Sequence, residues 1–497
     1  MPQLFFPPHT GGKVRDLSQE GNGIVALNSP DPAWQGRVLS LPDTVPGDEI
    51  EVLAYQSSGK RLAVTDYKLV QPSPDRQDAF CPHFASCGGC QLQDLTYQAT
   101  LAWKRKHVAD LLQRMAKLPI SVDAVKPCLS LTQPLAFRSI VRLHVNPLGQ
   151  LCFYGRKPQE LIPINTCPIQ SDQVNGLRQL VQALLTDQPS SEVAKLSSLE
   201  IRQNAENDAF MLTFNFHAQP LAPDWQDFFT QVRDQAGEAL GRGEASACAS
   251  LSLWLAVGED YVHIAGPEQL RMTENGLDFD FSPRAFQQTN LQLNQILYQE
   301  VVKAAQMVAD SKAGDASAII SAARLQQYPF KILELYCGSG TISLHLAQAF
   351  PEAQITGVEI VPEAIADAKH NAELNGFASD RLRFEVGDAG QALRQPQQPV
   401  SAQLSGESQE TGPASVQPPY DLLVVDPPRQ GLDPQLCQDI LASNIPHIIY
   451  VSCDPATLAR DLKTLKHAYS LQNIQPLDMF PWTTHVECAV LMSRVDK

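Results

Sequence analysis

Apolar residues follow two different spacings along this chain of 497 residues, and the spacing changes near residue 284. Before that point, short apolar runs separated by turn residues predict β-strands. After it, short apolar runs alternate with longer stretches of helical period. Alternation of strand and helix implies a parallel, doubly wound sheet, so the expected fold class is α/β.

The second spacing predicts a series of elements in the C-terminal part. Helices are expected at 291–305, 341–350 and 362–375, and strands at 331–335, 354–359, 383–386, 421–426 and 447–452. Residues 391–419 hold seven Gln and five Pro with few apolar residues, which predicts a disordered surface loop. Residues 308–328 are rich in Ala, Ser and Asp, which predicts a second insertion.

The first spacing predicts two smaller folds. Between 14 and 72, short apolar runs follow the turns at 21–23 and 46–48, which is typical of a small barrel of the oligonucleotide-binding kind. A linker is expected at 71–76, and a helix from 92 to about 115. From 134 to 270, apolar and polar residues alternate in several short segments, which predicts a mostly antiparallel sheet with helices.

The length predicts two or three domains, because a chain of 497 residues is too long for one core. We place a β-barrel at 1–75, a central α+β domain at 76–270 and the parallel sheet at 271–497. Residues 92–125 are expected to pack with the last of these domains.

Composition predicts a soluble globular protein, with 43% hydrophobic and 19% charged residues. No run of 18 apolar residues occurs, so we expect no membrane partner, and the N-terminus does not resemble a secretion signal. Eleven cysteines without regular spacing favour a reducing compartment, and hence a cytoplasmic protein whose cysteines serve as ligands or nucleophiles.

Charge gives two opposing indications about a nucleic-acid partner. The net charge of −16 argues against one, because such proteins usually carry a basic surface. Residues 101–160, however, hold ten Lys and Arg against three acids, a local net charge of +7. Charge therefore permits an RNA partner without establishing one, and a solvated helix face explains the basic residues at 104–106 equally well.

A glycine turn predicts the cofactor site. Gly338-Ser339-Gly340 stands where a strand ends and a helix begins, so backbone N–H groups can face a ligand. Glu359 ends the next strand, 21 residues after Gly338, where an acid can bind ribose hydroxyls. A dinucleotide site would look similar. The missing third glycine, and Asp388 after the third strand as an acceptor for an adenine amino group, favour S-adenosylmethionine.

Two further segments end strands of the same sheet. Asp426-Pro427-Pro428-Arg429 follows an apolar strand and could frame a planar group beside the methyl donor, although a plain turn is the alternative. Cys453 ends another apolar strand, at the edge where parallel sheets place their sites. A cysteine at such a position is more often a small, buried packing residue than a nucleophile. Neither 427 nor 428 is cysteine, which argues against a cytosine-5 enzyme.

Cys453 and Glu487 together suit methylation of uracil at carbon 5. That carbon becomes nucleophilic only when a thiolate adds to carbon 6, and a base must then remove the carbon-5 proton. Arg429 or the helix starting near Pro455 could stabilise the thiolate. A surface carboxylate is the alternative for Glu487.

A second group of cysteines has the spacing of a ligand set. Cys81, Cys87 and Cys90 lie close together with two glycines between the last pair, and Cys167 could be a fourth thiolate. Four thiolates suit a structural zinc ion and an iron–sulfur cluster equally well, and His83 could compete as a ligand.

Together these segments resemble the S-adenosylmethionine-dependent RNA uracil-5-methyltransferases, in particular the RumA-type enzymes of ribosomal RNA. The resemblance covers nearly the whole chain. It implies a class I, Rossmann-like methyltransferase domain, an N-terminal TRAM domain that binds RNA, and a 4Fe-4S cluster held by the four cysteines. It also implies 23S ribosomal RNA as substrate, a monomer, Cys453 as nucleophile and Glu487 as base. The residues expected to contact S-adenosylmethionine are Gln288, Tyr336, Gly338, Gly340, Thr341, Glu359, Asp388 and Asp426.

The chain departs from the family's pattern in its central part, at 137–140, at 158–159 and around Gln288. The donor-binding and catalytic segments are intact, so the departures bear on which RNA is the target. A transfer RNA uracil-5-methyltransferase is the alternative within the enzyme class. A non-catalytic RNA-binding or assembly factor is the alternative outside it.

Overall fold

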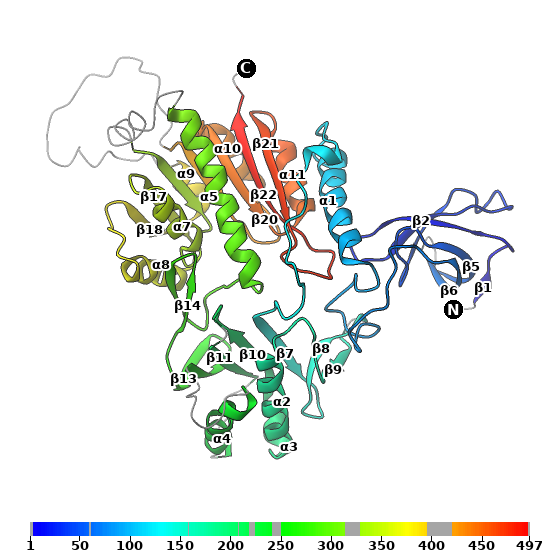
Figure 1. Cartoon of the computed structure of the whole chain (residues 1–497), viewed down its shortest axis with the longest axis horizontal. Helices are drawn as coiled ribbons and strands as arrows, with labels where there is room; N and C mark the ends of the chain where they lie inside the picture. The colour runs from blue at the N-terminus through cyan, green and yellow to red at the C-terminus, as the bar shows by residue number, and fades with distance from the viewer. Residues whose placement is uncertain are drawn as a thin grey trace. The chain divides into compact units, whose positions relative to one another are not determined.

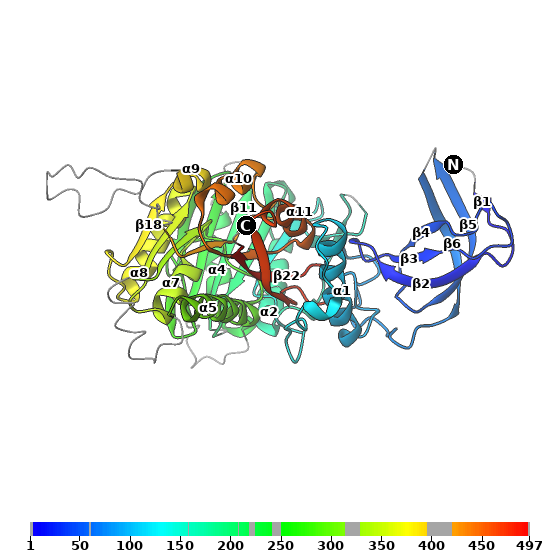
Figure 2. The same ribbon diagram turned by 90° about the horizontal axis from the view of Figure 1, so that it is seen from above.

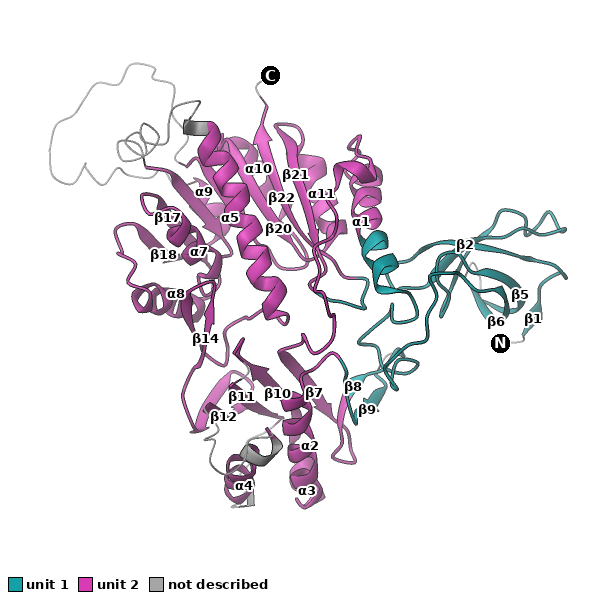
Figure 3. Cartoon of the chain, in the orientation of Figure 1, with its two compact units in different colours: residues 1–104, 153–168, 480–484 teal, residues 105–152, 169–479, 485–497 magenta. Residues whose placement is uncertain are grey.

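The computed structural model describes residues 3–58, 61–157, 159–206, 208–217, 224–240, 250–313, 329–394 and 420–495. These residues form two compact units, drawn in different colours in Figure 3. Unit 1 contains residues 1–104, 153–168 and 480–484, and unit 2 contains 105–152, 169–479 and 485–497. No helix in the described ranges is both long and apolar enough to span a lipid bilayer.

Unit 1 contains an antiparallel half-barrel with strand order β1-β5-β2-β3-β4, and β6 pairs with β5. Its core is formed by apolar side chains that point inward from alternate strand positions, including Val25, Leu41 and Val52. The predicted small N-terminal β-fold is therefore confirmed. The strands of the half-barrel are β1 Leu4–Phe5, β2 Gly11–Leu17, β3 Gly23–Ala26, β4 Val38–Leu41, β5 Glu49–Ser58 and β6 Arg61–Gln71. Unit 1 also contains β9 Leu161–Pro163, which is not part of the half-barrel.

One sheet of unit 2 has the order β13-β12-β11-β10-β7-β8. Its pairs are antiparallel, as predicted, except that β11 and β12 are parallel. Helix α4 lies between these two strands in the chain and supplies the crossover that a parallel pair needs. The elements are β7 Ile140–Val145, β8 Leu151–Tyr154, α2 Asp172–Thr186, α3 Ser190–Val193, β10 Leu196–Gln203, β11 Ala209–Phe216, α4 Asp224–Ala239, β12 Ser250–Val257 and β13 Asp260–Ala265, followed by the hairpin β14 Leu270–Glu274 and β15 Leu277–Phe281.

The other large sheet of unit 2 has the order β18-β17-β16-β19-β20-β22-β21. The first five strands are parallel and confirm the predicted doubly wound sheet, whereas β22 runs antiparallel to both β20 and β21. The strands are β16 Lys331–Leu335, β17 Gln354–Glu359, β18 Leu382–Val386, β19 Leu422–Val425, β20 His447–Ser452, β21 Tyr469–Leu477 and β22 Glu487–Arg494.

Helices cover both faces of this sheet (Figures 1 and 2). Helix α5 contacts β20, β21 and β22 on one face. The apolar residues of α10 and α11, and of α1 from Val108 onward, share one buried core with β16, β19, β20 and β22. The helices are α1 Tyr97–Arg114, α5 Leu291–Ala313, α7 Thr341–Ala349, α8 Pro362–Leu374, α9 Ala389–Arg394, α10 Pro434–Ser443 and α11 Pro455–Leu465, with a 3₁₀ turn at Val122–Ala124.

Three predicted boundaries were wrong. Helix α1 begins at Tyr97 rather than at 92, and buried Leu92 and Leu95 pack with Trp103 before the helix starts. Helix α5 continues to 313, because Val308 and Ala309 prolong its buried stripe into the stretch predicted as an insertion. Residues 391–394, predicted as loop, belong to α9. The other residues of the two predicted insertions, 314–328 and 395–419, lie outside the described part of the chain.

Candidate active site

Five parallel strands end at one edge of the sheet, and the predicted site residues follow these ends. Parallel strands place their carboxyl ends together, which is where α/β sheets bind ligands. Tyr336 follows β16, Glu359 ends β17, Asp388 follows β18, Asp426 follows β19, and Cys453 follows β20. The last predicted residue, Glu487, comes from β22. Because β22 is antiparallel to β20, Cys488 pairs with Ser452, and the first residue of β22 lies at this same edge.

The turn after β16 has the backbone conformation of a ligand-binding loop. Tyr336, Gly338 and Gly340 all have positive φ, at 64°, 53° and 81°. A Cβ at Gly340 would lie 2.7 Å from the ring of Phe384, so only glycine fits there. A Cβ at Gly338 would meet no atom within 4 Å, which shows open space beside the turn.

Glu359 is held toward this turn by backbone donors. Its carboxylate accepts hydrogen bonds from Gly338 N at 3.4 Å and from Val361 N at 3.0 Å. Gly338, Glu359 and Val361 also line a cavity of about 560 Å³, which lies in the size range of small-molecule sites. The combination fits the ribose-binding role predicted for Glu359.

The other residues predicted to contact S-adenosylmethionine lie in different surroundings. Thr341 accepts a hydrogen bond from the Tyr298 hydroxyl at 3.0 Å. Asp388 is exposed and accepts from Gln391 N at 3.0 Å, at the start of α9. Gln288 is half-buried in the segment before α5. Their contacts with S-adenosylmethionine stay predictions.

Cys453 lies half-buried between β20 and α11, whose N-cap is Asp454. Burial raises the pKa of the thiol to about 12, and the carboxylates of Glu487 and Asp426 add to the increase. Arg429 acts in the opposite direction. Arg429, one of the two groups that we expected to stabilise the thiolate, is therefore outweighed, and the neutral thiol predominates at pH 7.

Glu487 is almost completely buried, with 1% of its surface exposed. Its Oε2 atom has no hydrogen-bond partner among the described residues. Burial raises the pKa of this carboxyl well above its usual range, and the nearby Asp426 carboxylate raises it further. Burial likewise raises the pKa of Asp426 to about 7. A buried carboxyl whose pKa is raised holds a proton more strongly once it has accepted one, which is the property required of a general base.

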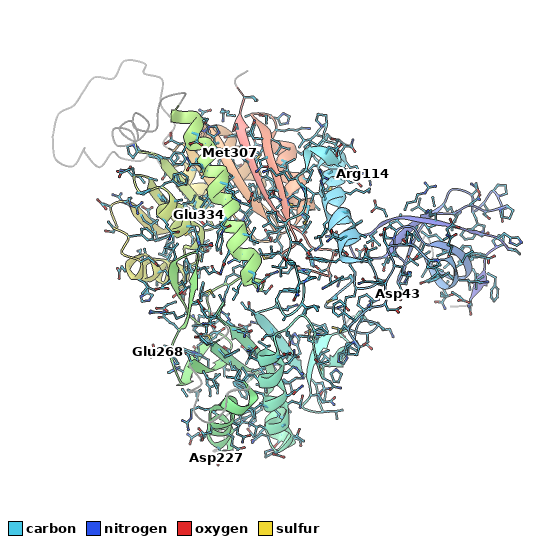
Figure 4. All side chains as sticks on the ribbon, in the orientation of Figure 1. Asp43, Arg114, Asp227, Glu268, Met307 and Glu334 are labelled. Carbon is cyan, nitrogen blue, oxygen red and sulfur yellow. The ribbon has the colours of Figure 1, made fainter. Side chains whose placement is uncertain are left out.

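Glu334, on β16, was not among the predicted site residues, and it is buried with 1% exposure (Figure 4). Burial raises the pKa of this carboxyl to about 8, and the hydroxyl of Ser343 donates a hydrogen bond to it. The negative charges of Asp426 and Glu359 raise the pKa of Glu334 as well. Glu334 therefore lies between residues predicted to bind S-adenosylmethionine and residues predicted to react. An acid inside the apolar run Leu333–Leu335 was the available signal.

All four candidate ligand cysteines lie in unit 1. Burial raises the pKa of the Cys90 thiol to about 12, and the Cys167, Cys87 and Cys81 thiols contribute to the shift, so the four are near neighbours. The loop between them touches β8 closely, because Gly88 N donates to Tyr154 O at 2.9 Å and a Cβ at Gly88 would lie 2.8 Å from Gly155 O.

The described residues contain no group of three or more His, Cys, Asp or Glu side chains arranged to hold a metal ion. The predicted iron–sulfur site is thus not shown. His83, weighed as a competing ligand, uses its Nε2 atom to accept a hydrogen bond from Asn165 N at 3.4 Å.

Comparison with known proteins decides the family. The family described as tRNA (Uracil-5-)-methyltransferase matches residues 96–495. The chain belongs to this family. An uncharacterized RNA methyltransferase of Halalkalibacterium halodurans is 30% identical over 492 residues, which cover 96% of this chain and 95% of that protein. One of Bacillus cereus is 31% identical over 495 residues, covering 97% and 96%.

The fold is also that of a solved family structure. The chain superimposes with a TM-score of 0.65 on the tRNA (uracil-54, C5)-methyltransferase of Pyrococcus abyssi in complex with S-adenosyl-L-homocysteine. The alignment has 22% sequence identity and covers 97% of this chain and all of the other. The chain is an S-adenosylmethionine-dependent RNA (uracil-5-)-methyltransferase, as predicted, and RNA is its macromolecular substrate.

The conformation of the glycine turn gives a first prediction. Gly340→Ala should weaken binding of S-adenosylmethionine strongly, because the new Cβ must displace the Phe384 ring as well as adopt positive φ. Gly376→Ala is the matched control, since Gly376 also has positive φ, at 71°, but a Cβ there meets nothing within 4 Å. Titration calorimetry should show donor affinity reduced at least tenfold for Gly340→Ala alone. Equal affinities of the two variants would contradict this role of the turn.

The raised pKa of Asp426 gives a second prediction. The folded protein keeps this proton up to about pH 7, whereas the unfolded chain loses it near pH 4. This carboxyl therefore stabilises the fold at low pH, and its contribution is lost as the pH rises from about 4 to about 7. Asp426→Asn should raise the melting temperature at pH 8 and leave it unchanged at pH 4. Asp388→Asn, which changes an exposed carboxylate near the same edge, should produce no such gain.

Proposed function

We propose that the enzyme methylates carbon 5 of a uridine through a covalent adduct between Cys453 and carbon 6. The observation that carries this proposal is the antiparallel β20–β22 pair, which supports a nucleophile and a base acting at one edge of the sheet. Electrostatic coupling of the Cys453 thiol to Glu487, Asp426 and Arg429 supports the same grouping.

In the proposed reaction the Cys453 thiol loses its proton to solvent, the resulting thiolate forms a bond to carbon 6, and the electrons of the double bond move to carbon 5. Carbon 5 then takes the methyl group from the sulfonium of the donor, which leaves as S-adenosylhomocysteine. Glu487 removes the remaining proton from carbon 5, the double bond re-forms, and the carbon–sulfur bond breaks. Since the ring must be reached from both sides, the uridine is flipped out of its stack first.

We assign the donor to the edge formed by Gln288, Tyr336, Gly338, Gly340, Thr341, Glu359, Asp388 and Asp426. The open space beside Gly338 and the orientation of the Glu359 carboxylate support this assignment. A helix N-terminus next to a glycine turn is a favourable site for the polar groups of a nucleoside. The role of each residue is our inference from its place in this edge.

We also propose that Cys81, Cys87, Cys90 and Cys167 hold a 4Fe-4S cluster. The donor set fits, because four thiolates near one another are the ligands of such clusters. A single structural zinc ion is the alternative, because four thiolates suit it as well, and the choice of the cluster follows the resemblance to the family. The cluster would stabilise the loop at 81–90 and the RNA-binding surface around it.

The RNA that we propose as substrate is 23S ribosomal RNA. The resemblance of the chain to the RumA-type enzymes of ribosomal RNA supports this choice. Transfer RNA is the second candidate, supported by the family's description and by the substrate of the Pyrococcus abyssi enzyme. In cells that lack the gene, mass spectrometry should find one or more 5-methyluridines missing from 23S ribosomal RNA. A loss confined to transfer RNA would establish the second candidate instead.

Substitutions at the two proposed catalytic residues should separate the steps. Cys453→Ala should abolish methyl transfer without loss of donor binding, because no adduct can form. Glu487→Gln should accumulate a methylated covalent RNA–protein adduct, visible as a shifted band on a denaturing gel. General bases contribute about 10²–10⁴-fold to a rate, so decay of the adduct should slow by a factor in that range. Normal turnover by Glu487→Gln, with no shifted band, would refute the assignment of the base.

A further inference from the structure

The segment between β19 and α10 carries Arg429, which is exposed and belongs to no helix or strand. A hydrogen bond from Gly431 N to Pro428 O, at 2.8 Å, closes a turn at 428–431. Strand pairing gives no support to such a turn, so the side chains that reach it decide its position. The turn, Cys453 and α11 all belong to unit 2.

Arg460 and Asp461, on α11, bind the backbone of this segment from one side. The Arg460 guanidinium donates from Nη2 to Gln430 O at 2.8 Å and to Leu432 O at 2.9 Å. The Asp461 carboxylate accepts from Leu432 N at 2.8 Å. A hydrogen bond of 2.8 Å from Arg460 Nε to Asp461 Oδ1 joins the two side chains, which together form the Arg460–Asp461 clamp.

The clamp is itself fixed, and the turn fits it closely. Asp461 has 3% of its surface exposed and also accepts a hydrogen bond from the Tyr450 hydroxyl at 2.8 Å. Gly431 has a φ of 72°, and a Cβ there would lie 2.6 Å from Asp461 Oδ2 and 2.7 Å from Arg460 Nη2. Only glycine therefore lets the turn approach the clamp this closely.

Helix α11 connects this turn with the candidate nucleophile. The helix begins two residues after Cys453, and Thr457 lies in its first turn. A Cβ at Gly431 would lie 3.1 Å from the Cβ of Thr457. The turn at 428–431 consequently packs against the end of α11 that lies next to Cys453.

We propose that Arg460 and Asp461 are positioning residues, which hold the turn at 428–431 and with it Arg429 beside Cys453. The segment 457–461 was singled out in the sequence, and this gives its last two residues a role in the reaction. The inference rests on the proposed function of Cys453 as nucleophile.

The charge of Arg429 matters because of the groups around the thiol. Burial raises the pKa of the Cys453 thiol, and the carboxylates of Glu487, Asp426 and Asp454 raise it further, whereas Arg429 lowers it. Arg429 therefore increases the fraction of thiolate, which is the form that attacks carbon 6. Release of the turn from the clamp would move this positive charge away, raise the pKa and reduce the thiolate fraction.

The test measures alkylation of Cys453 by iodoacetamide in the full-length protein, without RNA or donor. Mass spectrometry of the Cys453 peptide separates this thiol from the other cysteines, and only the thiolate reacts. Arg460→Ala should slow alkylation about threefold to tenfold at every pH from 7 to 9, because a pKa higher by one unit means tenfold less thiolate. A general loss of structure would expose the thiol and accelerate the reaction instead.

Two further variants separate the contacts of the clamp from its charge. Arg460→Lys keeps the positive charge but lacks the planar fork that binds both carbonyls, so it should also slow alkylation. Gly431→Ala changes no charge, displaces the turn from the clamp, and should have the same effect. Arg394→Ala and Gly376→Ala are the matched controls and should leave the rate within about twofold. Arg394 is likewise half-exposed and paired with a largely buried aspartate, and Gly376 has positive φ with nothing within 4 Å.

A double-mutant cycle decides whether the clamp acts through Arg429. Arg429→Ala should slow alkylation at least as much as Arg460→Ala, and the double variant should be no slower than Arg429→Ala alone. Slowing by the same factor in both backgrounds would overturn the proposal, as would an unchanged or faster reaction of Arg460→Ala. Should Arg460→Ala not fold, Arg460→Lys takes its place in the cycle.

Alkylation needs neither RNA nor turnover, so its outcome is independent of the proposed reaction. If the cycle holds but Cys453→Ala still transfers methyl groups, the positioning of Arg429 stands and the assignment of the nucleophile fails. If Cys453→Ala is inactive but the clamp variants react like the parent protein, the proposed reaction stands and the positioning role is wrong.

Discussion

The antiparallel pairing of β22 with β20 is the constraint on which the candidate site depends. A parallel sheet gathers the ends of its strands at one edge, but the start of a parallel strand lies at the opposite edge. Strand β22 runs in the opposite direction, and Glu487 is its first residue. Glu487 therefore lies at the edge where Cys453 follows the end of β20. Two residues from opposite ends of neighbouring strands can then act on one ring. The pairing of β22 with β21 continues along the whole strand and keeps this register in place.

The same edge concentrates acidic groups in surroundings that oppose their ionisation. Glu334, Asp426 and Glu487 each have a raised pKa, and burial is the first cause in each case. The charge of Asp426 raises the pKa of Glu334 and of Glu487 further. Cys453 shares this environment, and Arg429 is the cation that opposes the shift. Burial at this edge therefore opposes ionisation of both the candidate nucleophile, Cys453, and the candidate base, Glu487. Such a site is destabilising by itself, and the apolar core shared by α1, α10, α11 and the sheet compensates for it.

Much of the parallel sheet could be predicted because its strands are short apolar runs that end at turn residues. The bounds of β16, β17 and β20 agree with the prediction at both ends. Strand β21 was not recognised, since Gln472, Asn473 and Gln475 interrupt its apolar positions and Pro476 stands in it. The antiparallel direction of β22 depends on which neighbour the strand meets, and a linear pattern holds no information on this. Glu334 was missed for a related reason, because its significance lies in its burial. The cysteine spacing indicated that four thiols would be neighbours, but it left their ligand open.

The position of β22 also affects how this sheet can be made. The strand is synthesised after both β20 and β21, yet it lies between them. Until residues 487–494 leave the ribosome, these two strands have no partner on their facing edges, and apolar side chains such as those of Ile449 and Ile474 lack their cover. The sheet therefore cannot be completed strand by strand in the order of synthesis, because the gap between β20 and β21 stays open until β22 is made.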